Sequence, residues 1–216
     1  MSWYPPPEKA PHRAEISVLH ADTVLFRVHS ARFGPTEFNP TDPNSLEAGG
    51  GGRFDSPGGE PPFLYAARSP ETAVVESLLR DLPFDARGGR ELSAAALAAR
   101  CVSELRATRG LSLVALHGAG LAEVGQNTWL VHSDASEYPQ TRIWGRAIMA
   151  WNPRASGLEW RPRHDDDGLA VCLYEDRAGD RLEAVRTLPL WEGEGLALVR
   201  ATLLAFGVAA PGVIRQ

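Results

Sequence analysis

One short segment constrains the fold of this chain more than any other, because it joins a strand to a helix through a single turn. Residues 62–81, PFLYAARSPETAVVESLLRD, begin with an alternating run that predicts a strand, with Tyr65 at the centre of one face. Ser69 then suits the N-cap position and Pro70 the first helical position. The segment therefore predicts a strand-to-helix unit at this point of the chain.

The predicted helix has an apolar face with one acidic residue beside it. At about 3.6 residues per turn, the apolar side chains fall on one arc made of Val74, Val75, Leu78 and Leu79. Glu76 falls just beside Leu79, at the edge of that arc. We therefore expect Glu76 where a buried face meets an open one.

Residues 22–30, DTVLFRVHS, also alternate and predict a strand in which an apolar row of Val24, Phe26 and Val28 faces away from Leu25, Arg27 and His29. Further patterns predict a helix in the first half of 91–110, a strand over 111–118, a helix over 137–151, a buried strand over 168–176 and a helix with a strand in 195–212. The apolar residues of the helix over 137–151 are Ile143, Trp144, Ala147 and Ile148. Residues 31–62, rich in Pro, Asn, Asp and Gly, are expected to form a long irregular loop.

These elements mix without regular βαβ alternation, and the sequence has no internal repeat, so the predicted fold class is α+β. The length of 216 residues suits one domain. We expect a proline-rich, extended arm over residues 1–15 and a single domain over residues 16–216. The arm lacks the basic flank and apolar core of a signal peptide, so the protein is expected to be cytoplasmic.

Charge and hydropathy argue against two kinds of partner. With 22 basic and 27 acidic residues the net charge is -5, so the general attraction to phosphate backbones is missing and nucleic acid is not expected to bind directly. No apolar run approaches the roughly 18 residues that span a bilayer, so no membrane partner is expected. Cys101 and Cys172 lack a CxxC or metal-ligand spacing and are predicted to be buried thiols.

Four residues could carry chemistry, and each has an ordinary alternative. Arg53 follows the glycines at 49–52, which either bring backbone N–H groups close to a ligand or form a flexible linker. Arg27 is either a ligand-binding arginine or a solvent-exposed charge on an edge strand. Tyr65 is either a platform for a flat ligand or a half-buried strand aromatic, and Glu76 is either a site carboxylate or a solvated helix residue.

Taken together, these residue types suit chemistry at the C1 carbon of a ribose. Arginine side chains hold a pyrophosphate through paired hydrogen bonds, and an aromatic ring packs on a flat base. A carboxylate stabilises the positive charge that develops on the sugar as the leaving group departs. These are the groups needed to cleave NAD between nicotinamide and ribose.

Five motifs in the same order resemble the RES-domain family, whose members are usually toxins of bacterial Xre–RES toxin–antitoxin pairs. LFRVH, GGRFD and FLYAARSPETAVVES follow its Leu-x-Arg, Gly-Arg-Trp/Phe and Tyr-x-Ala-x-x-x-x-x-Ala-x-x-Glu patterns. Downstream, EYPQTRIWGRAIM resembles its Tyr-x-x-Thr-x-x-Trp helix, and GLEWRPRHDDDGLAVCLYEDR resembles its Gly-Ile-x-Tyr-x-Ser-Arg segment with the following strand. The resemblance covers residues 23–177, which is most of the chain.

The resemblance implies an ADP-ribosyltransferase-like core of mixed and antiparallel strands with surrounding helices, and NAD as the substrate whose ADP-ribose is released or transferred. Carried over by position, the catalytic residues are Glu76, Arg27 and Tyr65. The implied NAD-binding residues are Arg27, Arg53, Tyr65, Thr141, Trp144 and Arg163. The arginines would hold the pyrophosphate or the adjacent ribose, Tyr65 would pack against nicotinamide, and Glu76 would stabilise the cation. The family also implies a protein partner, an Xre-type antitoxin that covers the cleft, while self-association as a homodimer stays open.

The chain departs from the family pattern at one letter. Where the family has its serine, Pro162 stands between Arg161 and Arg163, and proline has neither a hydroxyl nor an N–H. Ser156 lies before Gly157, on the wrong side of the motif. An alternative to the enzyme is therefore a catalytically impaired module that binds NAD or a partner. A nuclease or other RNA-acting toxin is a second alternative, which the acidic balance disfavours.

No metal site is predicted. The run HDDDG at 164–168 places neighbouring side chains in divergent directions, and no second set of ligands is spaced to complete a coordination shell. His117 lies in HGAG, which resembles an oxyanion loop only loosely, and the chain has no Gly-x-Ser-x-Gly elbow. His132 and Ser133 are neighbours in sequence, but adjacency does not make a catalytic pair. Both are therefore expected to have a structural role only.

Overall fold

Eight strands form one curved, mixed sheet in the computed structural model, which describes residues 4–39, 51–56, 58 and 60–213. The strand order is β1-β6-β7-β8-β3-β2-β5-β9, and every neighbouring pair is antiparallel except β6 with β7. The strands are β1 (Ile16–Leu19), β2 (Val24–Ser30), β3 (Phe63–Ala67), β5 (Arg100–Ala107), β6 (Leu111–Leu116), β7 (Gly157–Trp160), β8 (Ala170–Tyr174) and β9 (Leu182–Pro189). The predicted α+β class with a mixed sheet is confirmed.

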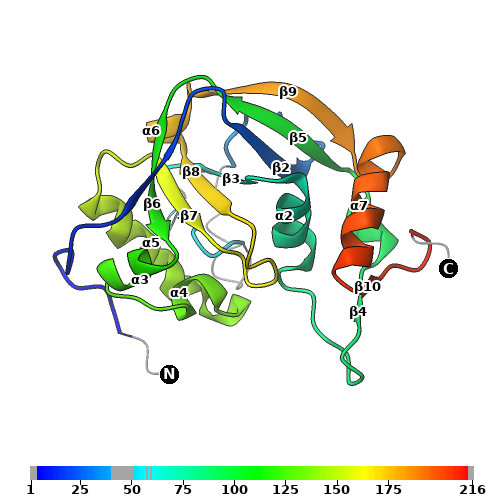
Figure 1. Ribbon diagram of the computed structural model, residues 1–216, viewed down its shortest axis with the longest axis horizontal. Helices are drawn as coiled ribbons and strands as arrows, with labels where there is room; N and C mark the ends of the chain where they lie inside the picture. The colour runs from blue at the N-terminus through cyan, green and yellow to red at the C-terminus, as the bar shows by residue number, and fades with distance from the viewer. Residues whose placement is uncertain (1–3, 40–50, 57, 59, 214–216) are drawn as a thin grey trace.

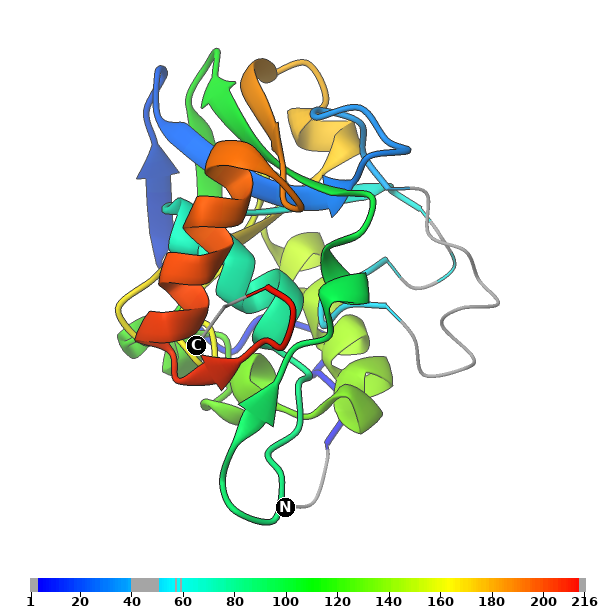
Figure 2. The ribbon, with the colours of Figure 1, turned by 90° about the vertical axis from the view of Figure 1, so that its right-hand side faces the viewer.

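The helices cover the sheet in two groups (Figure 1). The first group, beside β6 to β8, consists of α3 (Ala119–Glu123), α4 (Trp129–His132) and α5 (Tyr138–Trp151). The second group consists of α2 (Pro70–Val74) and α7 (Gly193–Ala205), which contact each other and the half of the sheet that contains β2, β5 and β9; Figure 2 shows α7 in front of α2. The short helix α6 (Glu175–Ala178) follows β8, and β4 (Arg90–Glu91) pairs with β10 (Val208–Ala209) next to α7. None of the described helices is long and apolar enough to cross a bilayer.

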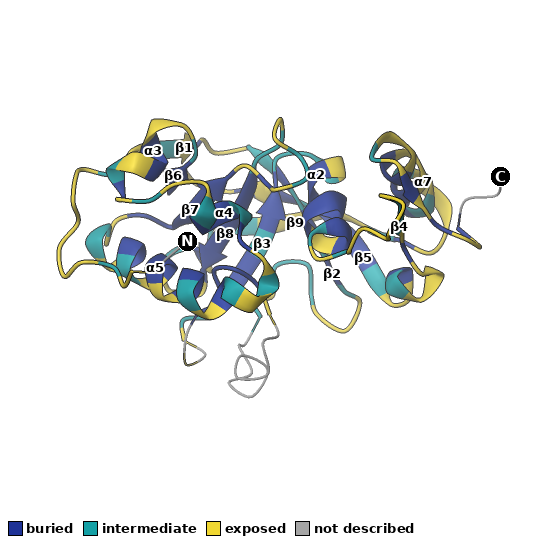
Figure 3. Ribbon diagram, turned by 90° about the horizontal axis from the view of Figure 1, so that it is seen from below, coloured by how far each residue is buried: buried dark blue, intermediate teal, exposed yellow. Residues whose placement is uncertain are grey.

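Three clusters of buried apolar side chains hold these layers together. The first joins β6 to β8 with α3 to α5 and contains Trp144 and Trp160. The second lies around α2, α7 and β5, and the third contains leucines from β2, β3, β5, β6 and β8. Figure 3 shows this burial along the strands and on the inward faces of the helices. Cys101 and Cys172 are buried free thiols, as predicted.

The strand-to-helix unit forms as predicted, but the helix changes its period. Ser69 accepts a hydrogen bond from the Thr72 backbone N–H at 3.0 Å, and Pro70 is the first residue of α2. The next turn, Val75–Leu79, is a π-helix. Val74, Val75, Leu78 and Leu79 are buried, as predicted. Glu76, expected at the edge of the apolar arc, is buried with only 7% of its surface exposed.

Two further expectations are wrong in detail. The segment 91–110 contains one 3₁₀ turn, Ala94–Leu97, in place of a longer helix, because Ala99 has a φ of 54° and the chain then enters β5. In α5, Ile143 is 42% exposed, although it was expected to be on the apolar face. The buried face of α5 instead includes the polar residues Thr141 and Arg142, which contact the turn before β3.

The N-terminal arm and the long loop both contact the domain. The Trp144 indole N–H donates to the Tyr4 carbonyl at 3.0 Å, and Ala14 packs on the first apolar cluster. The described parts of 31–62 are mainly turns and bends, with one bridge between Asn39 and Phe63. Residues 40–50, 57 and 59, including the first two glycines of the four-glycine run, lie outside the described residues.

Candidate active site

The last two glycines of the run build a tight turn that directs Arg53 inward. Gly51 has a φ of 84°, and a side chain on Gly52 would come within 2.6 Å of the Tyr65 hydroxyl. The Gly52 N–H donates to Asp55 at 2.7 Å, closing the turn on itself. Only glycine fits these two positions, so this part of the run is a built turn and not a flexible linker.

Tyr65 locks this turn from the neighbouring strand. Its hydroxyl donates to Asp55 Oδ1 at 2.8 Å and accepts from the Phe54 N–H at 2.8 Å. Its ring makes edge contacts with Phe63 and Trp160 at centroid distances of 5.4 and 6.0 Å. Burial raises the pKa of Tyr65 well above its ordinary value, and the nearby Asp55 carboxylate raises it further. Tyr65 therefore acts in this structure as a neutral support for the turn that carries Arg53.

Arg53 connects two elements that are far apart in sequence. Its guanidinium is 1% exposed, and its NH1 lies 3.5 Å from Glu76 Oε1 on the π-turn. Its NH2 donates to the Ser133 carbonyl, just after α4, at 3.0 Å. Its Cζ lies 5.1 Å from the centre of the Tyr138 ring at the start of α5. Arg53 therefore lies where the two helix groups meet.

Helix α5 supplies the supports of Arg53. The Thr141 hydroxyl donates to the Arg53 carbonyl at 2.8 Å, and the Arg142 Nε donates to the Gly52 carbonyl at 2.9 Å. The Tyr138 ring also lies 5.3 Å from the Cζ of Arg80, and its hydroxyl donates to Asp81 at 2.9 Å. Burial raises the pKa of Tyr138 to about 12, although both arginines act to lower it.

Four buried polar atoms in this cluster have no hydrogen-bond partner among the described residues. They are Nε and NH1 of Arg53, Oε1 of Glu76 and the hydroxyl oxygen of Ser133. An unsatisfied buried polar group costs about 1–3 kcal/mol, and native proteins contain few of them. Arg53 NH1 and Glu76 Oε1 form the 3.5 Å ion pair with each other, so Arg53 Nε and the Ser133 hydroxyl are the two atoms of this cluster without any partner among the described residues.

The environment of Glu76 sets its charge. Burial raises the pKa of this carboxyl above its ordinary value, while the positive charges of Arg53 and Arg80 oppose the shift. A carboxylate in low-dielectric surroundings interacts strongly with any positive charge brought next to it. The pair can therefore serve an anion through Arg53 and a cation through Glu76.

Of the predicted residues, Arg53, Glu76, Thr141 and Tyr65 are brought together through the 51–55 turn. Arg27 is buried on the inner row of β2, with 1% exposure, and donates to the Pro35 carbonyl at 2.8 Å and to Asn39 Oδ1 at 3.0 Å. Burial lowers the pKa of Arg27 to about 10, so it stays charged at neutral pH. In this structure its contacts hold the 34–39 loop.

Two other predicted residues lie apart from the cluster. Trp144 is in the first apolar cluster, against Trp151 and the N-terminal arm. Arg163 lies at the surface and forms an ion pair with Asp134. Sequence reasoning missed Ser133 as a site residue, because its only signal was a neighbouring histidine, and it missed Tyr138 and Arg80, although both lie in segments that were singled out.

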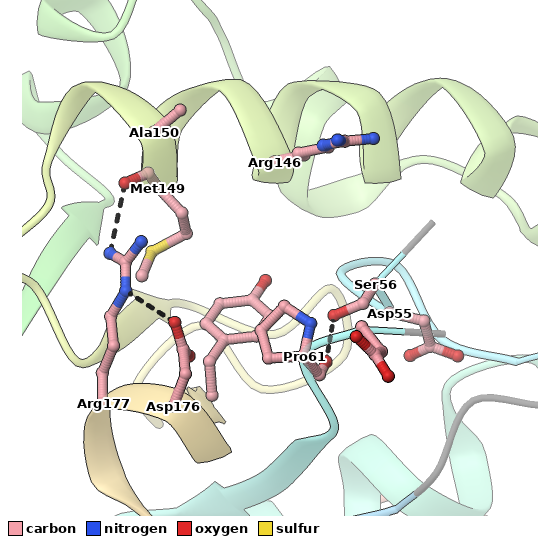
Figure 4. Close-up of a pocket in the computed structure, with 10 residues that line it drawn as sticks. Asp55, Ser56, Pro61, Arg146, Met149, Ala150, Asp176 and Arg177 are labelled. Atoms are coloured by element: carbon pink, nitrogen blue, oxygen red, sulfur yellow. Dashed lines mark hydrogen bonds and ion pairs between the residues drawn. The ribbon is translucent and has the colours of Figure 1, made fainter. Parts of the chain in front are cut away.

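A separate pocket of about 270 Å³ adjoins the Arg53 turn (Figure 4). Asp55 and Ser56 line it on one side, Asp176 and Arg177 line it on another, and Arg146 lines it from α5. Tyr174 also lines it. Arg177 donates to the Met149 carbonyl at 3.2 Å and pairs with Asp176 at 3.3 Å. The pocket is close to the lower limit of about 300 Å³ for small-molecule sites, and no substrate is assigned to it.

The acidic run HDDDG is part of the fold. The Thr72 hydroxyl donates to Asp165 at 2.6 Å, which ties this loop to the first turn of α2. Over residues 4–39, 51–56, 58 and 60–213, no group of three or more His, Cys, Asp or Glu side chains could hold a metal ion.

The comparisons with known proteins agree with this fold. One solved structure, described as the crystal structure of the M. tuberculosis MbcT–MbcA toxin–antitoxin complex, is similar with a TM-score of 0.60 at 17% identity, covering 86% of this chain and 91% of that one. No curated protein matches the chain. The family model described as the RES domain matches residues 24–192, well over half of the chain. The protein therefore belongs to the RES-domain family.

Proposed function

We propose that this chain is an NAD-consuming enzyme, a cytoplasmic toxin of the RES family, that breaks the bond between nicotinamide and ribose. The observation that carries the proposal is the buried Arg53–Glu76 ion pair, in which Arg53 Nε, Arg53 NH1 and Glu76 Oε1 make no hydrogen bond among the described residues. NAD offers both kinds of missing partner. Its phosphate oxygens accept from a guanidinium, and its positive nicotinamide end suits a carboxylate.

In the proposed reaction, the bond between the ribose C1 and the nicotinamide nitrogen breaks first. Its electron pair stays on the nitrogen, so the ring leaves as neutral nicotinamide and the ribose takes the positive charge. The Glu76 carboxylate stabilises that charge. An oxygen of water, of phosphate or of a protein side chain then bonds to C1, and a proton from a water or hydroxyl acceptor passes to solvent.

The other predicted residues differ in how directly they contact the Arg53 turn. Thr141 and Tyr65 already hold the Arg53 turn, and Tyr65 is proposed to flank the nicotinamide. Arg27 and Arg163 would bind NAD only by exchanging their present partners, the 34–39 loop and Asp134. Trp144 is proposed to support the wall of the site from α5.

Nicotinamide release from NAD by the purified protein tests the proposal. Glu76→Gln should lower the rate at least 100-fold, because it removes the charge and keeps the shape. Glu71→Gln is the matched control, since Glu71 is exposed on the same helix, and it should keep the wild-type rate. Equal rates in the wild type and Glu76→Gln would contradict the proposed role of Glu76.

One observation favours a second candidate function. Pro162 replaces the serine of the family pattern, so the chain could bind NAD as a regulatory module without turning it over. Calorimetric titration separates the two: NAD binding without nicotinamide release supports the module, and release that depends on Glu76 supports the enzyme. A wild-type protein that neither binds nor cleaves NAD would contradict both.

We also propose a protein partner. The similar structure contains an antitoxin beside the toxin, and an Xre-type antitoxin that covers the Arg53 site would block NAD. Co-expression with the product of a neighbouring gene should give a stable complex on size-exclusion chromatography and stop nicotinamide release. The same column run on the protein alone shows whether it forms a homodimer.

A further inference from the structure

A serine outside the family pattern lies against the Arg53–Glu76 pair. Ser133 is 5% exposed, and its carbonyl accepts the 3.0 Å hydrogen bond from Arg53 NH2. Its hydroxyl is buried and has no hydrogen-bond partner among the described residues. Most buried polar side chains bond to the protein or to ordered water. The hydroxyl of Ser133 is therefore available to something that is not part of the fold.

Ser133 also lies beside the proline that interrupts the family pattern. The residue before it, His132, contacts the Arg161 carbonyl through Nε2 at 3.3 Å. The residue after it, Asp134, forms an ion pair with Arg163. The two residues that flank Ser133 therefore contact the two residues that flank Pro162.

A pocket leads to the same residue. It is an open surface hollow of about 340 Å³, lined by Ser133 together with Trp129, His132, Asp134 and Glu137. This volume is within the range of small-molecule sites and can hold part of a nucleotide. Ser133 therefore touches Arg53 through its carbonyl and borders a space that a ligand can enter.

We propose that the Ser133 hydroxyl contacts the dinucleotide, donating to one of its oxygen atoms next to Arg53, and so supplies the hydroxyl that Pro162 lacks. This inference rests on the proposed function. In this proposal, the hydroxyl group comes from Ser133 at the end of α4, whereas the family pattern places it on a serine in the segment after β7.

The test compares two buried serines: the hydroxyl of Ser133 has no hydrogen-bond partner among the described residues, and the hydroxyl of Ser103 has two. Ser133→Ala removes a hydroxyl that has no partner in the protein, so the melting temperature should stay the same or rise. The Kd for NAD should increase about tenfold, which is the loss of one ordinary hydrogen bond. Ser103→Ala removes a hydroxyl that bonds His29 and Thr187, so it should lower the melting temperature and leave the Kd for NAD unchanged.

Two more variants complete the experiment. Ser133→Thr keeps a hydroxyl and should therefore keep most of the affinity for NAD. This variant tests the role of the hydroxyl in case Ser133→Ala disturbs the fold. Pro162→Ser should leave the affinity close to the wild-type value, because the position is already served by Ser133. A tenfold gain in Pro162→Ser that persists when Ser133 is alanine would overturn the inference.

The outcomes also distinguish this inference from the proposed function. A wild-type protein that binds NAD while Ser133→Ala binds it equally well refutes the role of Ser133 alone. A wild-type protein that binds no NAD refutes the proposed function, and the inference falls with it. A lower melting temperature in Ser133→Ala with an unchanged Kd would show that the serine is structural.

Discussion

At the scale of single residues, Glu76 shows how burial prepares a side chain for chemistry. A glutamate on a helix surface keeps its ordinary pKa, but the π-turn brings Glu76 into the second helix group, against Arg53. Burial is the main reason that its pKa is raised, and the charges of Arg53 and Arg80 limit the shift. The carboxylate thus pairs with an arginine that also has unpaired donors.

This shift predicts the pH dependence of nicotinamide release. In the proposed reaction, the ionised carboxylate stabilises the ribosyl cation. The value of kcat/KM should therefore rise as the pH increases through the pKa of Glu76. Because that pKa is raised above the ordinary glutamate value of 4.5, the acid limb should lie at a higher pH than an ordinary glutamate would give. A pH profile from 4 to 8 measures it, and the residual activity of Glu76→Gln should lack this limb. An identical acid limb in both proteins would assign it to another group.

At the scale of elements, β2 buries the face that carries its polar residues. His29 makes contacts with the Ser30 carbonyl at 2.9 Å and the Ser103 hydroxyl at 2.7 Å, and Ser103 continues to Thr187 at 2.8 Å. The polar ladder therefore crosses β2, β5 and β9. A neutral imidazole suits it, donating from Nδ1 to the carbonyl and accepting at Nε2 from the serine.

The ladder predicts how stability depends on pH. Burial lowers the pKa of His29 below 6.5, and the charge of Arg27 adds to the effect, so the unfolded chain binds a proton more readily than the folded chain. The contribution of His29 to stability is therefore fully present above the unfolded pKa of about 6.5 and is lost progressively as the pH falls from there through the lower pKa of the folded chain. The melting temperature should be higher at pH 7.5 than at pH 6, and His29→Gln should reduce the difference. The same difference in both proteins would contradict this account.

At the scale of the whole molecule, the candidate site lies at the junction of two helix groups on one curved sheet. Arg53 reaches the site from the loop before β3, Glu76 from the second group and Ser133, Tyr138 and Thr141 from the first. The N-terminal arm belongs to the same assembly, because Tyr4 accepts the hydrogen bond of Trp144 on α5. The arm is thus docked on the helix that supports Arg53.

Removal of the arm should therefore destabilise the protein. Deletion of residues 1–10 removes the carbonyl that accepts the indole N–H of Trp144, and the loss of this hydrogen bond should cost about 0.5–1.5 kcal/mol. Thermal unfolding measures the loss. In a Trp144→Phe background the same deletion should cost less, because no N–H is left unpaired. Equal losses in both backgrounds would show that the hydrogen bond to Tyr4 contributes nothing.

Much of the local structure could be predicted from the sequence. Alternation predicted β2 and β3, and the Ser69–Pro70 start predicted α2, because caps and strand faces depend on residues only a few positions apart. The motifs also singled out Arg53 and Glu76, which the fold brings within 3.5 Å of each other. The π-turn at Val75–Leu79 and the full burial of Glu76 were not predictable, because a period of 3.6 describes only a regular helix and the contact with Arg53 comes from a distant segment.

By itself, then, the sequence determined part of the secondary structure, including β2, β3 and α5, and where α2 begins. It also singled out side chains that suit the proposed nucleotide substrate. The tertiary structure decided which of those side chains meet. Arg27 donates to the 34–39 loop, Arg163 forms an ion pair with Asp134, and the Ser133 carbonyl accepts from Arg53. The physical reason is distance along the chain: Arg53 and Ser133 are 80 residues apart, and no local periodicity carries information about a contact that forms only when two packed layers close on each other.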